Sequence, residues 1–402
     1  MNSPRLDQLL TRAALSRVFE PSDNVGLALV AAAGPVDALR VATGRVRAGA
    51  DLSREVTEVL AAFGIPASGN SVASALERWA PRVQDLSPER DLATVQRLGG
   101  ELLIPEDPRW PEALRGLELG MPLCLWTRGN LSRGIPELRR TAAVVGSRDS
   151  TGYGASAAGD IAAGLVTRGW TVVSGGAYGI DAQAHRAALA TGGVEQIPTI
   201  AVMAGGVDRY YPAGNEDLLR EVARCGLLLS EVPPGSSPTR WRFLQRNRII
   251  AALGAVTVVV EARWRSGALN TAHHAAALGR EVGAVPGSVY SANSAGCHRL
   301  LRDGSAVCVT DAAEVIELGS PIDAADGAAG TAHEGPRAVH DGLTIEDMLL
   351  LDALPLRTGS PVEKLASVAG LSVSSVRAGL ARLELEDLAA RDGQGKWRRS
   401  RT

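Results

Sequence analysis

The chain has 402 residues, of which 45% are hydrophobic and only 4% aromatic, and its formal net charge is −2. This length allows two or three domains with cores of their own, and a charge so near zero leaves a polyanionic partner open, because basic residues can still cluster locally. The four cysteines form no CxxC pair, which argues against a zinc site or a disulfide framework.

No charged-then-apolar leader opens the chain, and no apolar run reaches the length of a membrane span. We therefore expect a soluble, cytoplasmic protein with no membrane span.

Residues 1–98 have the pattern of an N-terminal helical domain, of the SAM or helix-hairpin-helix kind. Apolar residues recur at helical spacing in 6–18, 24–33, 36–42 and 71–79, and Gly and Pro separate these segments. None of these residues has catalytic spacing, so we predict an accessory role.

Residues 99–318 alternate between apolar runs and helical patterns, which predicts a doubly wound α/β sheet. A lead-in with short strands at 102–104 and 123–126, joined by a helix at 111–117, is expected to pack against the main sheet. The predicted strands of that sheet are 142–145, 170–173, 199–203, 227–231, 256–261, 282–285 and 306–309. The predicted helices are 153–168, 181–190, 216–224, 242–253, 269–278, 294–302 and 312–318.

Glycine turns follow the first two strands of this sheet, as Gly146-Ser147-Arg148 and Ser174-Gly175-Gly176. Ligands of such sheets bind at the carboxyl ends of the strands, where both turns fall. Backbone N–H groups at glycine turns favour anions, and Arg148 adds a full positive charge. The pattern therefore predicts a phosphate-sized anion site, unless the glycines serve only to make tight turns.

Two common nucleotide sites do not fit these turns. The spacing is not G-x-G-x-x-G, and no acidic residue ends the second strand to hold the ribose of NAD. No Walker motif occurs either, because Lys364 and Lys396, the only lysines, lie far from the glycine turns.

The segment TRWRFLQRNRII, residues 239–250, interleaves arginines with Trp241 and Phe243. On a helix, Phe243, Arg246 and Asn247 share one face. An aromatic ring beside guanidinium groups is how proteins hold single-stranded nucleic acid, with the ring for a base and the cations for phosphates. An amphipathic surface helix with Phe243 in the core would give the same pattern, so both interpretations stay open.

The titratable residues do not form a catalytic set. Asp181 and His185 stand at i and i+4, where a mutual hydrogen bond is favoured over an acid–base pair, and Glu261 could face the cleft. His273 and His274 diverge on a helix, so they predict no metal site. Without a nucleophile–base pair we expect a protein that is not an enzyme and needs no cofactor.

The C-terminal part divides into a linker and a small domain. Residues 319–342 are mostly Ala, Gly and Asp, which predicts a flexible linker. Residues 343–402 predict helices at 345–354 and 362–369, a third helix capped by Ser372, and a hairpin of 388–391 with 396–398. This order is that of a winged helix.

Seven strings resemble, in the same order, the DNA-processing protein A family (DprA/Smf). They are AVVGSR, SGGAYGIDAQAH, GGVDRYYPAGN, LLLSEVPPG, RFLQRNRIIA, VVVEARWRSGALNTA and AVPGS. The resemblance runs from about residue 102 to 318 and departs at Leu244, where the family usually has proline, and at Asn270.

The resemblance implies an extended Rossmann-like fold that binds single-stranded DNA and loads a RecA-type recombinase during natural transformation. It also implies a homodimer without known enzymatic activity. The DNA-binding positions expected from the resemblance and the turns are Gly146, Ser147, Arg148, Ser174, Gly175, Gly176, Phe243, Arg246, Asn247, Arg248, Ser266 and Gly267.

A second hypothesis is a nucleotide-processing enzyme of the phosphoribohydrolase-like kind, whose members resemble this chain in fold and in glycine turns. Those enzymes carry a PGGxGT loop with a nearby catalytic glutamate. The sequence contains no such loop.

Overall fold

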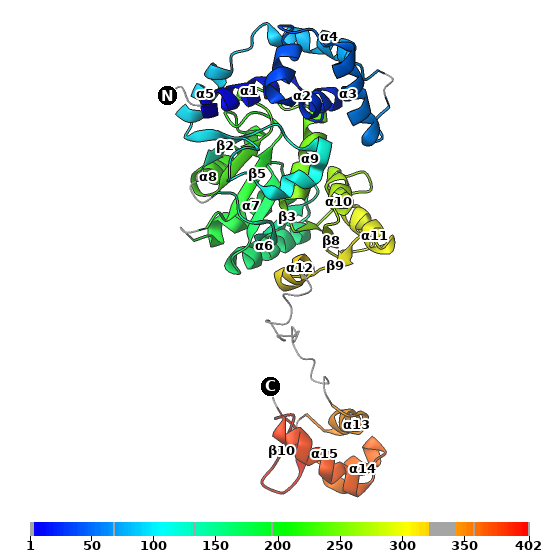
Figure 1. Ribbon diagram of the computed structural model, residues 1–402. Helices are drawn as coiled ribbons and strands as arrows, with labels where there is room; N and C mark the ends of the chain where they lie inside the picture. Colours follow the sequence, from blue (N-terminus) through cyan, green and yellow to red (C-terminus); the bar gives the residue numbers. More distant parts are fainter. Residues whose placement is uncertain are drawn as a thin grey trace. The chain divides into compact units, whose positions relative to one another are not determined.

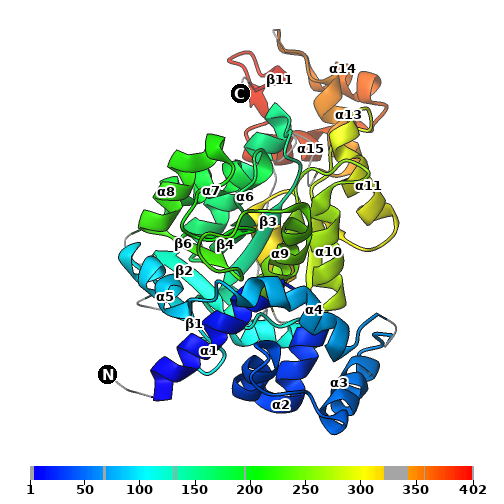
Figure 2. The ribbon, with the colours of Figure 1, turned by 90° about the horizontal axis from the view of Figure 1, so that it is seen from above.

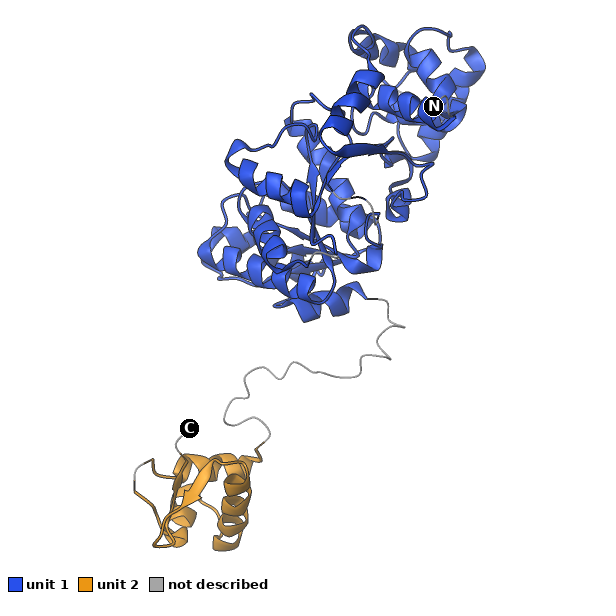
Figure 3. Cartoon of the chain, turned by 90° about the vertical axis from the view of Figure 1, so that its left-hand side faces the viewer, with its two compact units in different colours: residues 1–325 blue, residues 326–402 orange. Residues whose placement is uncertain are grey.

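The computed structural model describes residues 4–66, 69–129, 131, 134–193, 196–320, 343–356 and 358–400. The chain divides into two compact units, residues 1–325 and residues 326–402 (Figure 3). The larger unit contains the N-terminal helices and the main sheet, and the smaller unit contains helices with a hairpin (Figure 1).

The sheet of the larger unit has nine strands in the order β1-β2-β6-β5-β4-β3-β7-β8-β9 (Figure 2). Its parallel strands are β3 (Thr141–Val145), β4 (Thr171–Gly175), β5 (Thr199–Met203), β6 (Leu227–Ser230), β7 (Val256–Val259), β8 (Glu281–Ala284) and β9 (Val307–Cys308). The predicted α/β fold with a large parallel sheet is therefore confirmed. The lead-in strands β1 (Gly100–Leu103) and β2 (Leu125–Gly129) extend this sheet rather than packing on it, with β2 antiparallel to β6 and β1 antiparallel to β2.

The strand order reverses direction once. From β3 the chain adds β4, β5 and β6 on one side, and then returns through α9 (Arg240–Leu253) to place β7 on the other side of β3. The two strands pair in parallel from Ala142 with Val256 to Val145 with Val259. Beyond their carboxyl ends the chain leaves these two neighbouring strands towards opposite faces of the sheet, which makes this the switch point of the fold.

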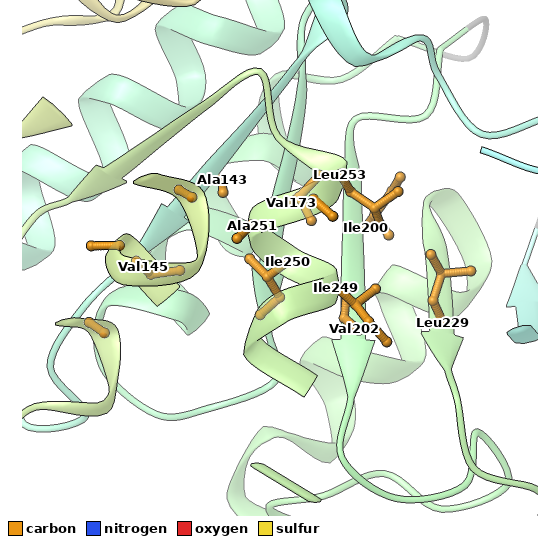
Figure 4. Close-up of a cluster of buried hydrophobic side chains, with 14 of the residues drawn as sticks. Ala143, Val145, Val173, Ile200, Val202, Leu229, Ile249, Ile250, Ala251 and Leu253 are labelled. Atoms are coloured by element: carbon orange, nitrogen blue, oxygen red, sulfur yellow. The ribbon is translucent and has the colours of Figure 1, made fainter. Parts of the chain in front are cut away.

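Both faces of the sheet are covered by helices, as the apolar strands require. Ala143 and Val145 lie in one cluster with α9, α10 (Gly267–Ala277) and α11 (Ala295–Arg302), part of which is shown in Figure 4. Ala142 and Val144 point to the other face, because strand side chains alternate. There they meet α6 (Gly152–Thr167), α7 (Ile180–Thr191) and α12 (Ala312–Gly319).

The part of the sheet around β6 is covered by one helix from the middle of the chain and one from its beginning. Leu219 and Val222 of α8 (Glu216–Cys225) lie in a cluster with Leu228 of β6, to which Leu92 and Val95 of α5 (Pro88–Arg97) also belong. The helix predicted at 111–117 is the 3-10 helix η1 (Glu112–Gly120). Shorter 3-10 turns are η2 (Leu138–Arg140), η3 (Ala213–Asn215) and η4 (Ala292–Ser294).

The N-terminal helices are α1 (Pro4–Val18), α2 (Asn24–Ala42), α3 (Ala50–Ala62), α4 (Val72–Val83) and α5. Their cluster includes Phe19 and Trp79, whose ring centroids are 4.4 Å apart. The helices α3 and α5 were not predicted, because each buries only two or three residues and so shows a weak apolar pattern.

Among the described helices, α2 alone has the length and apolar composition that could cross a membrane. Gly34 interrupts it with the non-helical angles φ 76° and ψ 166°, directly before Pro35. Each half is therefore far shorter than the ~20 residues of a span, and Val25, Leu29 and Val41 lie in the N-terminal core. The two helical segments predicted here, 24–33 and 36–42, match this break.

The smaller unit consists of α13 (Ile345–Ala353), α14 (Val362–Ala369), α15 (Val373–Leu385) and the hairpin of β10 (Ala389–Arg391) with β11 (Trp397–Arg399). The Ser372 hydroxyl accepts a hydrogen bond from the Ser375 N–H, so the predicted cap is confirmed. Both lysines, Lys364 and Lys396, belong to this unit. The elements follow in the order predicted for a winged helix, while the predicted linker lies outside the described residues from 321 onward.

We expect residues 343–402 to fold without the rest of the chain. Leu350, Leu380, Leu383 and Trp397 are buried against one another, and all of them lie within this stretch. The isolated fragment should give a helical circular dichroism spectrum and a cooperative melt. A random-coil spectrum would show that this core depends on the larger unit.

Candidate functional site

The switch point between β3 and β7 opens into a cavity of about 370 Å³. Four segments line it: the turn after β3, Ala177 and Asp181 of the segment after β4, the cavity-facing side of α9, and the loop after β7 with the start of α10. The predicted site residues that they contribute are Gly146, Ser147, Arg148, Phe243, Arg246, Asn247, Ser266 and Gly267. The structure thus brings together segments that are about a hundred residues apart in sequence.

Phe243 lies between two guanidinium groups in this cavity. The Cζ atom of Arg148 is 5.0 Å from the ring centroid and that of Arg246 is 5.9 Å away. A second ring, that of Tyr211, approaches to 5.9 Å at a 49° tilt. Arg148 is exposed and forms no ion pair with any described residue, so its charge is available to a ligand.

Arg246 is the buried counterpart of Arg148, with 7% of its surface exposed. Its Nη1 donates to the Val202 carbonyl at the end of β5, while its Nε has no partner among the described residues. Burial lowers the pKa of Arg246 to about 10, the Asp181 carboxylate opposing this and Arg148 adding to it. At neutral pH the group is still a cation, and it lines the cavity.

Gly175 makes the position of Arg246 possible. A Cβ atom on Gly175 would lie 2.2 Å from Arg246 Nη1, so the guanidinium occupies the space of the missing side chain. Ser174 is fully buried and donates to the Val144 carbonyl at 2.6 Å. The residues of the predicted turn therefore have different roles. Ser174 and Gly175 support the cavity from behind, whereas Gly176 lines a smaller neighbouring cavity with Phe243 and Tyr211.

The start of α10 forms the opposite wall. Asn247 Nδ2 donates to the Gly267 carbonyl at 3.3 Å and to Asn270 Oδ1 at 3.2 Å, which ties α9 to this helix end. Ser266 caps the helix by accepting from the Ala268 N–H. A helix N-terminus adds partial positive charge to a cavity that is already lined by four arginines.

The prediction for Arg248 is not supported by its position. Arg248 is 4% exposed, forms a bidentate ion pair with Glu231 at 2.6 and 2.9 Å, and donates to the Gly120 carbonyl. It points from the opposite side of α9 to Arg246, away from the cavity. Its role in this structure is to hold η1 and the end of β6 to α9.

A polar network that the sequence did not suggest joins the turn after β3 to the loop after β7 and to Asn293. Ser147 Oγ donates to Asp149 Oδ1 at 2.6 Å, and Arg263 from the loop after β7 pairs with the same carboxylate. Asn293 Nδ2 donates to the Asp149 carbonyl at 2.7 Å. The Ser147 hydroxyl, followed by Arg263, lowers the pKa of Asp149, so this carboxylate is ionised and neutralised in place.

The start of α9 is anchored by the N-terminal helices. Arg242 Nη2 donates to Glu20 at 2.7 Å, and Arg82 of α4 donates to the same carboxylate oxygen. The Trp241 indole donates to the Pro21 carbonyl at 3.2 Å. Two residues of the arginine-rich segment are thus engaged in fixing the helix that carries Phe243.

His185 does not bond to Asp181, so the predicted mutual hydrogen bond is wrong. Its Nε2 lies 2.7 Å from the Gly175 carbonyl and its Nδ1 lies 2.7 Å from Thr199 Oγ1. Burial lowers the pKa of His185 to about 4, so the ring is neutral and donates from Nε2 to the carbonyl. His185 fixes the end of β4 on which Arg246 lies.

Glu261 does not face the cleft either. It is 1% exposed, and it accepts from the Thr151 N–H at 2.9 Å and from the Thr151 hydroxyl at 2.6 Å. Its role is to hold the start of α6. Within the described ranges, no three His, Cys, Asp or Glu side chains converge in a way that could hold a metal ion.

Arg265 and Tyr211 are cavity residues that the sequence reasoning missed. Arg265 is exposed on the cavity wall and forms no ion pair with the described residues, and Tyr211 lies beside Phe243. The signal for Arg265 was present in RWRSGAL, where two arginines flank an aromatic residue, but that segment was considered only for Glu261 and Ser266.

Comparison with known proteins gives a consistent family. The family model described as DNA recombination-mediator protein A matches residues 101–319. The putative DNA processing protein DprA of Mycobacterium tuberculosis is 42% identical over 96% of this chain and 93% of its own length. The DNA processing protein DprA of Bacillus subtilis is 34% identical over 54% of this chain and 70% of its own. The X-ray structure of DprA from Streptococcus pneumoniae matches with a TM-score of 0.59 and 30% identity, over 76% of this chain and 95% of that one.

Gly175→Ala should destabilise the fold by about 1–3 kcal/mol, because a methyl group must displace a buried guanidinium from its carbonyl partner. Gly152→Ala is the matched control, since a Cβ there meets nothing within 4 Å and the position opens a helix. Urea unfolding of both variants measures the difference. Equal stabilities would mean that Arg246 has room to relocate.

His185 should make stability depend on pH. In the unfolded chain His185 is protonated with its ordinary pKa of 6.5, whereas in the folded protein its pKa is about 4. The His185 contribution is therefore complete above pH 6.5 and is lost as the pH falls from 6.5 towards 4. Between pH 7 and pH 5 the wild type should lose about 2 kcal/mol more than His185→Gln in urea unfolding. Parallel pH profiles would contradict this assignment.

Proposed function

This chain belongs to the DNA recombination-mediator protein A family, and we propose that it binds single-stranded DNA and places a RecA-type recombinase on it. The family establishes a role in DNA processing and recombination. The single-strand ligand and the recombinase are the proposal.

One observation carries the proposal: Phe243 lies between an exposed and a buried arginine at the switch point of the sheet. A ring next to cations suits a base with its phosphates, and it tolerates any sequence because every base has a π-face. The buried Arg246 guanidinium adds a positive charge beside the ring.

The interaction energies favour a base replacing the Arg148 guanidinium on the ring of Phe243. A cation over a ring at an exposed site contributes about 0.5–1 kcal/mol. A base stacked on the ring contributes about 1–3 kcal/mol. The exchange is therefore favourable, and it frees Arg148 to pair with the phosphate of the same nucleotide.

The proposal also covers the location of the protein, its oligomeric state and its two smaller domains. We propose that the protein acts in the cytoplasm as a homodimer, which would place two cavities on one strand and raise affinity through effective concentration. We also propose that residues 1–98 form an accessory helical domain and residues 343–402 a winged helix. The family name and the sequence resemblance support these assignments.

We propose further that the protein acts by binding and not by catalysis. Two titratable side chains near the cavity are engaged in the fold, His185 between two strands and Glu261 at the start of α6, and Asp181, which lines the cavity, is only 6% exposed. This arrangement does not favour the alternative of a phosphoribohydrolase-like enzyme, which needs an accessible glutamate.

Arg148→Ala and Phe243→Ala should separate the two halves of the site. Releasing one counterion contributes about 0.7 to the slope of log K against log salt for a single strand. Arg148→Ala should weaken oligo-dT binding and flatten the slope by about this amount. Phe243→Ala should cost about 1–3 kcal/mol and leave the slope nearly unchanged, because stacking releases no counterion.

The controls are Arg54→Ala, which removes an exposed arginine from α3, and circular dichroism of every variant. Two folded site variants with wild-type affinity would end the proposal. Release of free base from nucleoside monophosphates, with no gel shift on oligo-dT, would favour the enzyme instead.

A further inference from the structure

Trp264 stands on the loop after β7, between the cavity residues Arg263 and Arg265. More than half of its side chain, 53%, is exposed. The Cζ atom of Arg299 lies 5.0 Å from the ring system and covers one face of it. The indole therefore presents a large aromatic surface directly outside the cavity, where a flat ligand can stack.

The positions of the tyrosines point the same way. The chain has only five, and each follows the carboxyl end of a parallel strand: Tyr153 after β3, Tyr178 after β4, Tyr210 and Tyr211 after β5, and Tyr290 after β8. With Trp264 after β7, they mark the edge of the sheet that contains the cavity. In a chain with 4% aromatic residues, this concentration indicates a surface for flat ligands.

The charge beside Trp264 suits a polyanion. Arg265 and Arg299 form no ion pairs with the described residues, whereas Arg263 is neutralised by Asp149. Adjacent strands of a sheet lie about 4.8 Å apart, so the loop after β7 is one step from the turn after β3. Asp149, which lines the cavity beside this loop, is already paired with Arg263.

We propose that Trp264 is a second base-stacking position, reached by the strand as it leaves the cavity across β7, with Arg265 and Arg299 at its phosphates. This inference rests on the proposed single-strand function and adds to it a direction and a second subsite. Arg299 holds the indole flat and leaves its other face to the base. The cavity and Trp264 together form one track along the carboxyl edge of the sheet.

Anisotropy with labelled oligo-dT of increasing length tests this track in the full chain. Trp264→Ala should bind the shortest oligonucleotide recognised by the wild type equally well, and should lose about 5- to 150-fold on longer ones. Trp264→Phe should retain most of the affinity, because a ring remains. Arg265→Ala should lower the salt slope by about 0.7, a change that Trp264→Ala should not cause.

Fluorescence gives an independent readout, since indole emission is quenched when a base stacks on it. Oligo-dT should quench the wild type more than Trp264→Phe. Phe63→Ala is the matched control, because Phe63 is a similarly exposed aromatic residue on the N-terminal helices, and its affinity should equal that of the wild type.

Equal affinity of wild type and Trp264→Ala at every length, with equal quenching in Trp264→Phe, would overturn the second subsite while the proposed function stands. The same result is expected if Trp264 contacts a protein partner. A wild-type chain that binds no oligonucleotide at all would overturn the proposed function and this inference together.

Discussion

The architecture of the site depends on one crossing: the Arg246 side chain passes over the end of β4 and donates to the Val202 carbonyl of β5. It can do so because residue 175 has no side chain, and because His185 holds the same backbone from beneath. A buried guanidinium costs several kcal/mol of desolvation unless its donors are used. For Arg246 only Nη1 has a hydrogen-bond partner among the described residues, and the group lines the cavity.

The helix that carries Arg246 has two tasks along its length. Its second half, from Ile249 to Leu253, is buried in the sheet core (Figure 4). Its first half is tied by Trp241 and Arg242 to the N-terminal helices. Phe243 therefore projects from a segment that is fixed at both ends, which suits a stacking surface because little order has to be gained on binding.

Much of this was predictable, for identifiable reasons. The strand–helix alternation and the glycine turns are local patterns, so the parallel sheet and the residues Gly146, Arg148 and Phe243 could be placed from sequence. Arg248 lies about 200° around the helix from Arg246, but its ion-pair partner Glu231 is distant in the chain, so the sequence did not show that its charge is already paired. The Asp149–Arg263 pair was missed for the same reason, since it joins loops that become neighbours only at the switch point.

The almost complete use of arginine for basic positions has a practical consequence for anyone attaching probes to this protein. The side-chain amines, on Lys364 and Lys396, both belong to the smaller unit. Amine-reactive dyes and surface coupling through these groups leave the guanidinium groups around the cavity chemically unchanged. For the same reason, lysine acetylation has no target on the sheet, and a cell that silenced this site by modification would have to do so through other chemistry.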